Sequence, residues 1–209
     1  MSVAWATSVA PDSKFKRMEE LRDATFGVSR MMSGSHIMPQ YGAKVHGWEA
    51  DLISFKELGD INELVRGTKE GKVDAFMWER TTTKRYYDKG DLRMLGVVTP
   101  PWPAFSFVAR QDVIEAKRSE FDDFFRCLNQ VNEAFVDAAP EQRQRSINFI
   151  MNKFGYGQED VEQWFAQVQY ARDTRKVDLD LLERASSILR DVGAATVAKR
   201  GEEMSLSLL

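Results

Sequence analysis

Cysteine and histidine are scarce in this chain of 209 residues, which holds one cysteine, Cys127, and two histidines, His36 and His46. A single cysteine cannot form an intrachain disulfide, so nothing points to an oxidising compartment. We expect Cys127 to be small and buried, because it lies in a helical apolar pattern. The histidines are ten residues apart on one predicted helix, roughly 15 Å along its axis. They therefore cannot share a metal ion, and we expect neither a metal site nor a cofactor.

Long apolar runs and an excess of positive charge are also missing. No run approaches the roughly 20 residues that a membrane span needs. The first residues lack the basic and apolar regions of a signal peptide, so we expect a cytoplasmic protein without a membrane partner. The formal net charge of −3 implies no general attraction to nucleic acid. The nucleophile-elbow, Walker A and GxGxxG motifs are absent as well, which leaves no catalytic signature to follow.

Short apolar runs alternate with helical patterns over the first half of the chain. We predict strands within residues 2–9, 25–28, 51–55, 73–78, 91–98 and 104–109, with helices at 58–67 and 80–88. This spacing favours βαβ units, and hence an α/β fold with a mainly parallel sheet and flanking helices. From Gln111 to about Val192 the pattern is helical throughout, which predicts a C-terminal helical segment.

The stretch from Thr25 to Gly47 carries the first candidate site. A short strand leads into Ser33-Gly34-Ser35, which are residue types that favour a helix N-terminus. Such a turn directs several backbone N–H groups and two hydroxyls to one spot, where the helix dipole favours an anion or a polar ligand. The alternative is that the serines only cap the helix.

The helix that follows has its own expected features. Ile37, Tyr41 and Val45 recur at i, i+4 and i+8, so we expect them to form its apolar stripe. Pro39 is tolerable if it falls in the first turn, where its missing N–H costs little.

A second candidate site follows the strand predicted at 73–78. Glu79 comes directly after Trp78, and the carboxyl ends of parallel strands are where ligands bind. Thr81 to Thr83 add hydroxyls at the start of a helix. The alternative is a helix-capping acid with capping threonines. Trp102, between two prolines, is either a ligand-stacking aromatic or a packing residue.

Three motifs together resemble a known family. They are GVSRMMSGSH at 27–36, GKVDAFMWERTTTK at 71–84 and PPWPAFSFVAR at 100–110. In this order they resemble the type 2 periplasmic-binding-protein-like family, in its nitrate, sulfonate, taurine and thiamine-precursor binding group. Within that group they are most similar to a soluble solute-binding-like subfamily. The resemblance covers about residues 2 to 193.

The resemblance implies two α/β lobes joined by crossing strands, with a ligand held in the cleft between them. Residues 1–110 would be the second lobe with the crossing strands. Residues 111–193 would be helices that pack on the first lobe, and residues 194–209 a tail. The segment that builds most of the first lobe should precede Trp5 and is missing. We therefore expect either a truncated chain or a lobe supplied by another chain or copy.

The resemblance also assigns roles to site residues. Ser33, Gly34 and Ser35 would donate hydrogen bonds to an acidic or polar ligand group, and His36 would orient that turn. Trp78 and Glu79 would face the same cleft, with Glu79 as an acceptor. Thr82 and Trp102 would be rim contacts. The implied partner is a small polar or anionic molecule.

The resulting hypothesis is a solute-binding-protein-like domain that binds a small molecule without transforming it. One alternative is an enzyme of thiamine-pyrimidine-type metabolism, which predicts a cluster of cysteines and histidines that the chain lacks. The other alternative is a truncated homologue that acts through protein–protein contacts and self-associates through its incomplete lobe.

Overall fold

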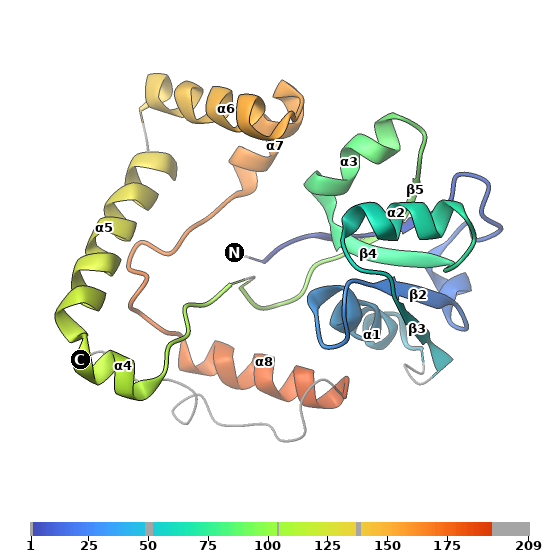
Figure 1. The fold of residues 1–209 in the computed structure, drawn as a ribbon, viewed down its shortest axis with the longest axis horizontal. Coiled ribbons are helices and arrows are strands. Elements are labelled where there is room, and N and C mark those ends of the chain that lie inside the picture. The colour runs from blue at the N-terminus through green and yellow to red at the C-terminus, as the bar shows by residue number, and fades with distance from the viewer. Residues whose placement is uncertain (1, 49–51, 104, 137–138, 194–209) are drawn as a thin grey trace. The chain divides into compact units, whose positions relative to one another are not determined.

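The computed structural model describes residues 2–48, 52–103, 105–136 and 139–193. These residues form two compact units (Figure 1). The sheet unit comprises Ser2–Trp102 together with the chain from Glu183, and the helical unit is built from Pro103–Leu182. The boundary that we predict at residues 110 and 111 stays a prediction, as does the packing of residues 111–193 on a first lobe. The predicted tail at 194–209 lies outside the described residues.

Five strands form one sheet in the order β3-β2-β4-β1-β5. They are β1 (Trp5–Val9), β2 (Thr25–Val28), β3 (Ser54–Glu57), β4 (Ala75–Glu79) and β5 (Arg93–Val98). β2 runs parallel to β3 and β4, whereas β1 runs antiparallel to β4 and β5. The predicted α/β fold with a mainly parallel sheet and a C-terminal helical segment is confirmed.

Helices cover both faces of this sheet (Figure 1). The sheet unit contains a 3₁₀ turn, η1 (Met18–Leu21), and the helices α1 (Gly34–His46), α2 (Ile61–Lys69) and α3 (Arg80–Asp88). Met77 of β4 packs with the α1 side, while its neighbour Phe76 packs with the α2 and α3 side. This alternation is the period of two that a strand imposes on its side chains.

The buried side of α1 differs from the predicted stripe. Val45 is 56% exposed, whereas Met38, Gly42 and Ala43 are buried. Small residues on this side let the helix lie close to the sheet: a Cβ atom at Gly42 would sit 3.6 Å from Val98. Of the predicted stripe, Val45 therefore faces the solvent, whereas Ile37 and Tyr41 are half-buried and Tyr41 packs against the core.

Pro39 also departs from expectation, because α1 begins at Gly34 and Pro39 falls in its second turn. The carbonyl of Ser35, four residues earlier, has no N–H to accept from at that position. An interior proline costs a helix about 3 kcal/mol. Pro39 is completely buried. The packing of its side chain therefore offsets this cost, since tertiary packing outweighs helix propensity.

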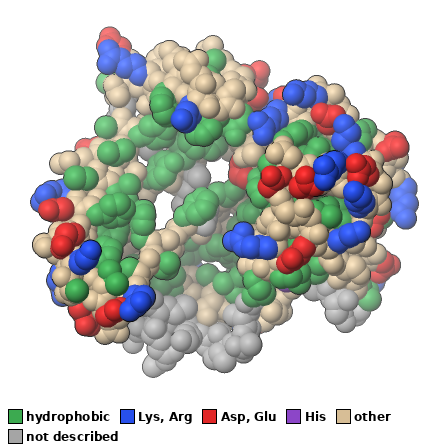
Figure 2. Space-filling view, viewed as in Figure 1, with side chains coloured by type: hydrophobic (Ala, Val, Ile, Leu, Met, Phe, Trp, Pro, Cys, Tyr) green, Lys and Arg blue, Asp and Glu red, His purple; other side chains and the backbone are tan. Residues whose placement is uncertain are grey.

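The helical unit contains α4 (Gln111–Ala116), α5 (Arg118–Val136), α6 (Pro140–Phe154) and α7 (Gln158–Gln167). Its buried core is a cluster of Ile147, Ile150, Val161 and Phe165. Figure 2 shows hydrophobic side chains gathered along its surface, and Phe124, Val131, Phe149 and Phe154 are among those exposed. The last helix, α8 (Leu179–Asp191), ends in the sheet unit, where Asp191 pairs with Lys44 of α1 at 2.6 Å.

Two predictions for this part of the chain are wrong. Residues 105–109 form no strand, and Phe105 and Val108 are 90% and 92% exposed; Ala104 lies outside the described residues. The segment has the composition of a strand but no neighbouring strand to pair with in the described chain. Cys127 is exposed, because Phe125 takes the buried side of α5 and a residue two positions later points about 200° away.

Among the described residues, no helix is long and apolar enough to cross a membrane.

One buried hydroxyl gives a test of this packing. Thr7 lies in β1, fully buried, and its Oγ1 has no hydrogen-bond partner within the described residues. Replacing it with an isosteric apolar group removes the cost of an unsatisfied polar atom. We expect Thr7→Val to raise the free energy of unfolding by about 1 kcal/mol or more, measured by urea denaturation.

Ser8→Ala is the matched control on the same strand. The Ser8 hydroxyl lies 2.6 Å from the hydroxyl of Tyr87, so its removal should lower the free energy of unfolding by about 1 kcal/mol. A loss of stability in Thr7→Val would show that the Thr7 hydroxyl is satisfied after all.

Candidate functional site

The candidate residues gather at one edge of the sheet. Trp5, at the start of β1, is paired in register with Glu79 at the end of β4 and with Val98 at the end of β5. Val28 at the end of β2 is paired with Glu57 at the end of β3. This edge therefore holds the carboxyl ends of four strands, which is where ligands bind in open α/β sheets.

Three serine hydroxyls at the start of α1 bond to one another. The Oγ of Ser33 and the Oγ of Ser35 are 2.8 Å apart, and the Oγ of Ser29 lies 3.2 Å from each. The Ser33 hydroxyl donates to the carbonyl of Arg30 at 2.7 Å. Ser33 occupies the N-cap position but makes no side-chain cap, so the alternative that the serines only cap the helix does not describe Ser33.

The first two backbone N–H groups of α1 are consequently open, by which we mean that they lack a hydrogen-bond acceptor within the described residues. The N–H groups of His36 and Ile37 donate to the carbonyl of Ser33. Within the described parts of the chain, the N–H groups of Gly34 and Ser35 have no acceptor. These two amides lie at the positive end of the helix dipole, which favours a negative ligand group.

Trp5 lies against this helix start. A Cβ atom built at Gly34 would lie 2.5 Å from Cη2 of the indole and 2.7 Å from Cζ2. Position 34 must therefore be glycine for the ring to cover the backbone. Sequence reasoning assigns Trp5 no role in the site, and its contact with Gly34 appears once the strand is paired at this edge.

The loop between β2 and α1 has a strained conformation. Met32 has a φ of 63°, in the left-handed region that non-glycine residues rarely adopt. Two side chains hold the loop backbone: the N–H of Met31 donates to Oε1 of Glu57 at 2.5 Å, and the N–H of Met32 donates to Nδ1 of His36 at 3.2 Å. The methionine side chains are 48% and 54% exposed, so the loop is held through its backbone.

His36 is buried between this loop and the sheet. Its ring packs edge-on against Phe55 of β3, with centroids 4.4 Å apart. Burial holds the pKa of His36 below its ordinary value, and the negative charge of Glu57 partly opposes that shift. Because the Met32 N–H donates to Nδ1, the proton of the neutral ring belongs on Nε2.

Glu79 adopts the capping arrangement. Its carboxylate accepts from the N–H groups of Thr81 at 2.8 Å and Thr82 at 2.7 Å, and from the Thr82 hydroxyl at 2.6 Å. Any ligand that uses Glu79 as an acceptor has to compete with these bonds. The roles of Glu79 and Thr82 in ligand binding stay predictions.

The two tryptophans named as candidates have packing partners of their own. Trp78 packs with the cluster on the α2 and α3 side of the sheet, opposite to α1. Trp102 packs edge-on against Tyr41 of α1, with ring centroids 5.1 Å apart. The structure thus brings Ser33, Gly34, Ser35 and His36 together with Trp5, and sets Glu79 beside Trp5 in the ladder. Ligand contacts by Trp78 and Trp102 stay predictions.

Sequence reasoning missed Ser29, Glu57 and Trp5. Ser29 follows a strand directly, a position that the strand-end rule could have found. Glu57 lies in β3, 26 residues from the Met31 amide that it accepts from, and no local pattern marks such a contact.

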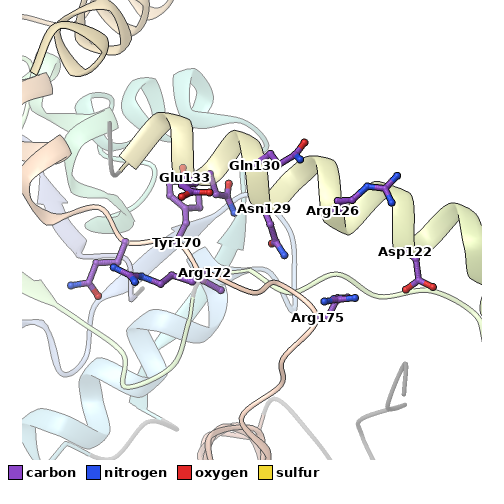
Figure 3. A pocket seen from close by; sticks show the side chains of 11 residues that line it. Asp122, Arg126, Asn129, Gln130, Glu133, Tyr170, Arg172 and Arg175 are labelled. Carbon is purple, nitrogen blue, oxygen red and sulfur yellow. The ribbon is translucent and has the colours of Figure 1, made fainter. Parts of the chain in front are cut away.

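The helical unit has a separate groove of about 780 Å³ between α5 and the segment before α8 (Figure 3). Asn129 of α5 links the two sides of the groove. Its Oδ1 accepts from the Thr174 N–H at 3.0 Å and from the Thr174 hydroxyl at 2.7 Å. Its charges are partly paired, since Arg175 donates to Asp173 and Arg126 to Asp123. No predicted site residue lines this groove.

The described residues contain no candidate metal site. In the ranges that the structure describes, no three His, Cys, Asp or Glu side chains gather where they could hold a metal ion.

Comparisons with known proteins agree with this geometry. Residues 5–98, which hold the whole five-stranded sheet, match the model of the Ca3427-like PBP family. The resemblance to periplasmic-binding proteins is thereby confirmed for this part of the chain. No curated protein sequence matches the chain.

Solved structures share the fold. The Candida albicans CA3427 product, which has the generic periplasmic-binding-protein fold, is 23% identical with a TM-score of 0.82 over 95% of this chain. The chain covers 65% of the length of that relative. The alkanesulfonate-binding protein SsuA from Xanthomonas axonopodis pv. citri, bound to MOPS, is 14% identical with a TM-score of 0.69, covering 96% of this chain and 70% of its own. PhnD1 from Prochlorococcus marinus, in complex with methylphosphonate, is 12% identical with a TM-score of 0.56. The match covers 93% of this chain and 68% of PhnD1.

The shifted pKa of His36 predicts a pH dependence. Because its folded-state pKa lies below the ordinary value of 6.5, the unfolded chain binds a proton more readily than the folded chain. His36 therefore contributes stability above about pH 6.5 that is lost as the pH falls toward the folded-state pKa. His36→Asn places an uncharged acceptor near the position of Nδ1 and removes this contribution.

We expect the difference in unfolding free energy between the unaltered chain and His36→Asn to shrink as the pH falls from neutral to about 5. Urea denaturation at a series of pH values measures it. His46 lies in the last turn of α1. His46→Asn, measured in the same way, is the control for removing a histidine elsewhere on the helix. A difference that stays constant with pH for His36→Asn would contradict the prediction.

Proposed function

We propose that this chain binds a small anion at the N-terminus of α1 and does not transform it. The observation that carries the proposal is a difference among the three helices that start at this sheet edge. Asp60 caps α2 by accepting from Asn62 and Glu63, and Glu79 caps α3. The N-cap side chain of α1, Ser33, accepts from no backbone N–H group of its helix. One positive helix end is thus left for an external negative group.

The solved relatives suggest the class of anion. SsuA is bound to MOPS, a sulfonate, and PhnD1 to methylphosphonate. Both compounds carry a tetrahedral anionic head, whose oxygens can accept from several converging N–H groups. A sulfonate or a phosphonate is therefore the ligand class that we propose for the open amides of Gly34 and Ser35.

The surroundings of these amides favour a ligand with a short apolar part. The indole of Trp5 lies against Gly34, and Met31 and Met32 expose their side chains on the adjoining loop. Thioether and aromatic side chains adapt readily to an aliphatic tail. We infer that the anionic head contacts the helix start while the tail contacts this apolar rim.

The hydrogen bonds of the site support binding rather than catalysis. The hydroxyls of Ser29, Ser33 and Ser35 bond to one another, and within the described chain none of them forms a hydrogen bond to a histidine nitrogen. A serine nucleophile needs an adjacent general base. This arrangement does not favour a reaction that uses one of these serines as a nucleophile.

A charge placed beside the helix start tests the proposal. Met32 has a positive φ, a conformation that Asn and Asp tolerate better than most residues. Met32→Asp and Met32→Asn are nearly isosteric and differ by one negative charge. We expect Met32→Asp to bind methylphosphonate and MOPS at least about tenfold more weakly than Met32→Asn, measured by calorimetry at low salt.

Added salt should reduce this difference, because it screens exposed charges. Equal affinities for the two variants would place the anion elsewhere. Failure of the unaltered chain to bind any sulfonate or phosphonate would refute the proposed ligand class.

A specific observation also favours self-association. Residues 105–109 are rich in residue types that favour strands, and Phe105 and Val108 are almost fully exposed. β5 is an edge strand with β1 as its sheet neighbour, and it exposes Met94 and Val97. We propose that residues 105–109 of one copy pair with β5 of a second copy, since the prolines at 100, 101 and 103 prevent a tight hairpin within one chain.

Light scattering over a range of concentrations tests this second proposal. We expect the unaltered chain to form dimers and the Phe105→Ser, Val108→Ser double variant to be monomeric at the same concentration, because the exposed apolar area is reduced. Phe149→Ser, at an exposed position on α6, should leave the dimer intact. A monomeric unaltered chain would refute self-association.

A further inference from the structure

The β2–α1 loop, residues 29–33, is held by side chains that come from outside it. Glu57 lies at the end of β3 and His36 in the first turn of α1. Their acceptor atoms take the N–H groups of two consecutive residues, Met31 and Met32. Two adjacent amides are therefore fixed from two sides, one from the sheet and one from the helix.

The loop needs such support, because its conformation is unfavourable by itself. The positive φ of Met32 is a strained conformation for an unbranched, non-glycine residue, and strain of this kind persists where the surroundings over-determine it. The side chains of Met31 and Met32 are exposed, so burial of these side chains does not hold the loop. Its backbone is held instead by hydrogen bonds: Met31 donates to Glu57 and Met32 to His36, while at the two ends of the loop Ser29 donates to Oγ of Ser35 and Ser33 to the carbonyl of Arg30.

Packing in turn fixes the two acceptors. Phe55 and Glu57 are two residues apart on β3 and share one face of the strand. The ring of Phe55 packs against the ring of His36. The strand, the histidine and the loop thus form one connected unit that sets where the chain enters α1.

We propose that Glu57 and His36 are positioning residues that hold the β2–α1 loop in its strained conformation and thereby keep the amides of Gly34 and Ser35 open. If the loop relaxed, its side chains could cap the helix start and satisfy these amides, as ordinary helix ends are satisfied. This inference rests on the proposed function for its effect on ligand affinity, but its effect on the loop does not depend on any ligand.

Glu57 gives the decisive comparison, because its two possible roles predict opposite results. Its negative charge disfavours a nearby anion, so removal of the charge alone should strengthen binding. Glu57→Gln removes the charge but keeps an oxygen that can accept from Met31, whereas Glu57→Ala removes both. If only charge mattered, both variants would bind an anion more tightly than the unaltered chain.

We expect Glu57→Gln to bind methylphosphonate at least as tightly as the unaltered chain, and Glu57→Ala to bind it about tenfold more weakly than Glu57→Gln. We also expect the backbone amide of Met31 to exchange its hydrogen about tenfold faster in Glu57→Ala than in Glu57→Gln, measured by NMR. Glu57 is exposed, so neither change threatens the fold.

Lys56→Ala is the matched control, because Lys56 is exposed on the same strand and points to the opposite face. It should leave the exchange of the Met31 amide unchanged. For the second acceptor, His36→Leu should speed the exchange of the Met32 amide, and His36→Asn, which can still accept, should restore it.

The outcomes separate the two proposals. Equal exchange of the Met31 amide in Glu57→Ala and Glu57→Gln would overturn the positioning role, whatever the affinities. Faster exchange in Glu57→Ala, in a chain that binds no sulfonate or phosphonate, would support the positioning role and refute the proposed function.

Discussion

The contact between the indole of Trp5 and the backbone at Gly34 is the constraint on which the site depends. Trp5 begins β1 and is paired with both Glu79 and Val98, so it lies between the ends of β4 and β5 at this edge of the sheet. Gly34 begins α1, and any Cβ there would collide with that ring. The contact therefore fixes the start of the helix against the end of the sheet. With the helix start fixed, the first two N–H groups of α1 are held at one place on the edge, and the loop from β2 has to reach them over a short span of chain.

Within this loop Met32 has a strained backbone conformation, and the side chains of Glu57 and His36 hold the loop backbone. A left-handed conformation at a non-glycine residue costs of order 1–3 kcal/mol. A hydrogen bond to a charged acceptor contributes about 1.5–3 kcal/mol, and one to a neutral acceptor about 0.5–1.5 kcal/mol. The bonds from Met31 to Glu57 and from Met32 to His36 are thus together large enough to offset the strain.

Sequence reasoning recovered what depends on local pattern and lost what depends on a distant partner. The strands at 25–28 and 91–98 and the helix at 80–88 are found in the structure, because their apolar spacing is local. The strand predicted at 104–109 failed, because composition records what a strand can bury and not whether another strand lies beside it. The stripe predicted on α1 failed because large residues were weighed above Gly42 and Ala43, whose small size is what lets the helix approach the sheet. At the candidate site, Ser33, Gly34, Ser35 and His36 could be named from sequence, whereas Glu57 could not, since its contact with Met31 spans 26 residues.

The serine at the N-cap of α1 shows why residue type alone cannot decide between capping and binding. Ser33 has the right chemistry and the right position to cap its helix, yet its hydroxyl donates to the Arg30 carbonyl and lies beside the hydroxyl of Ser35. Asp60 and Glu79, at the corresponding positions of α2 and α3, do cap theirs. Carboxylates can only accept, so at a helix start they turn toward the N–H groups. A hydroxyl also donates, and here a loop carbonyl takes that proton. The choice of serine over aspartate thus leaves the helix start uncapped and adds no negative charge, and both features favour an anion that comes from outside the chain.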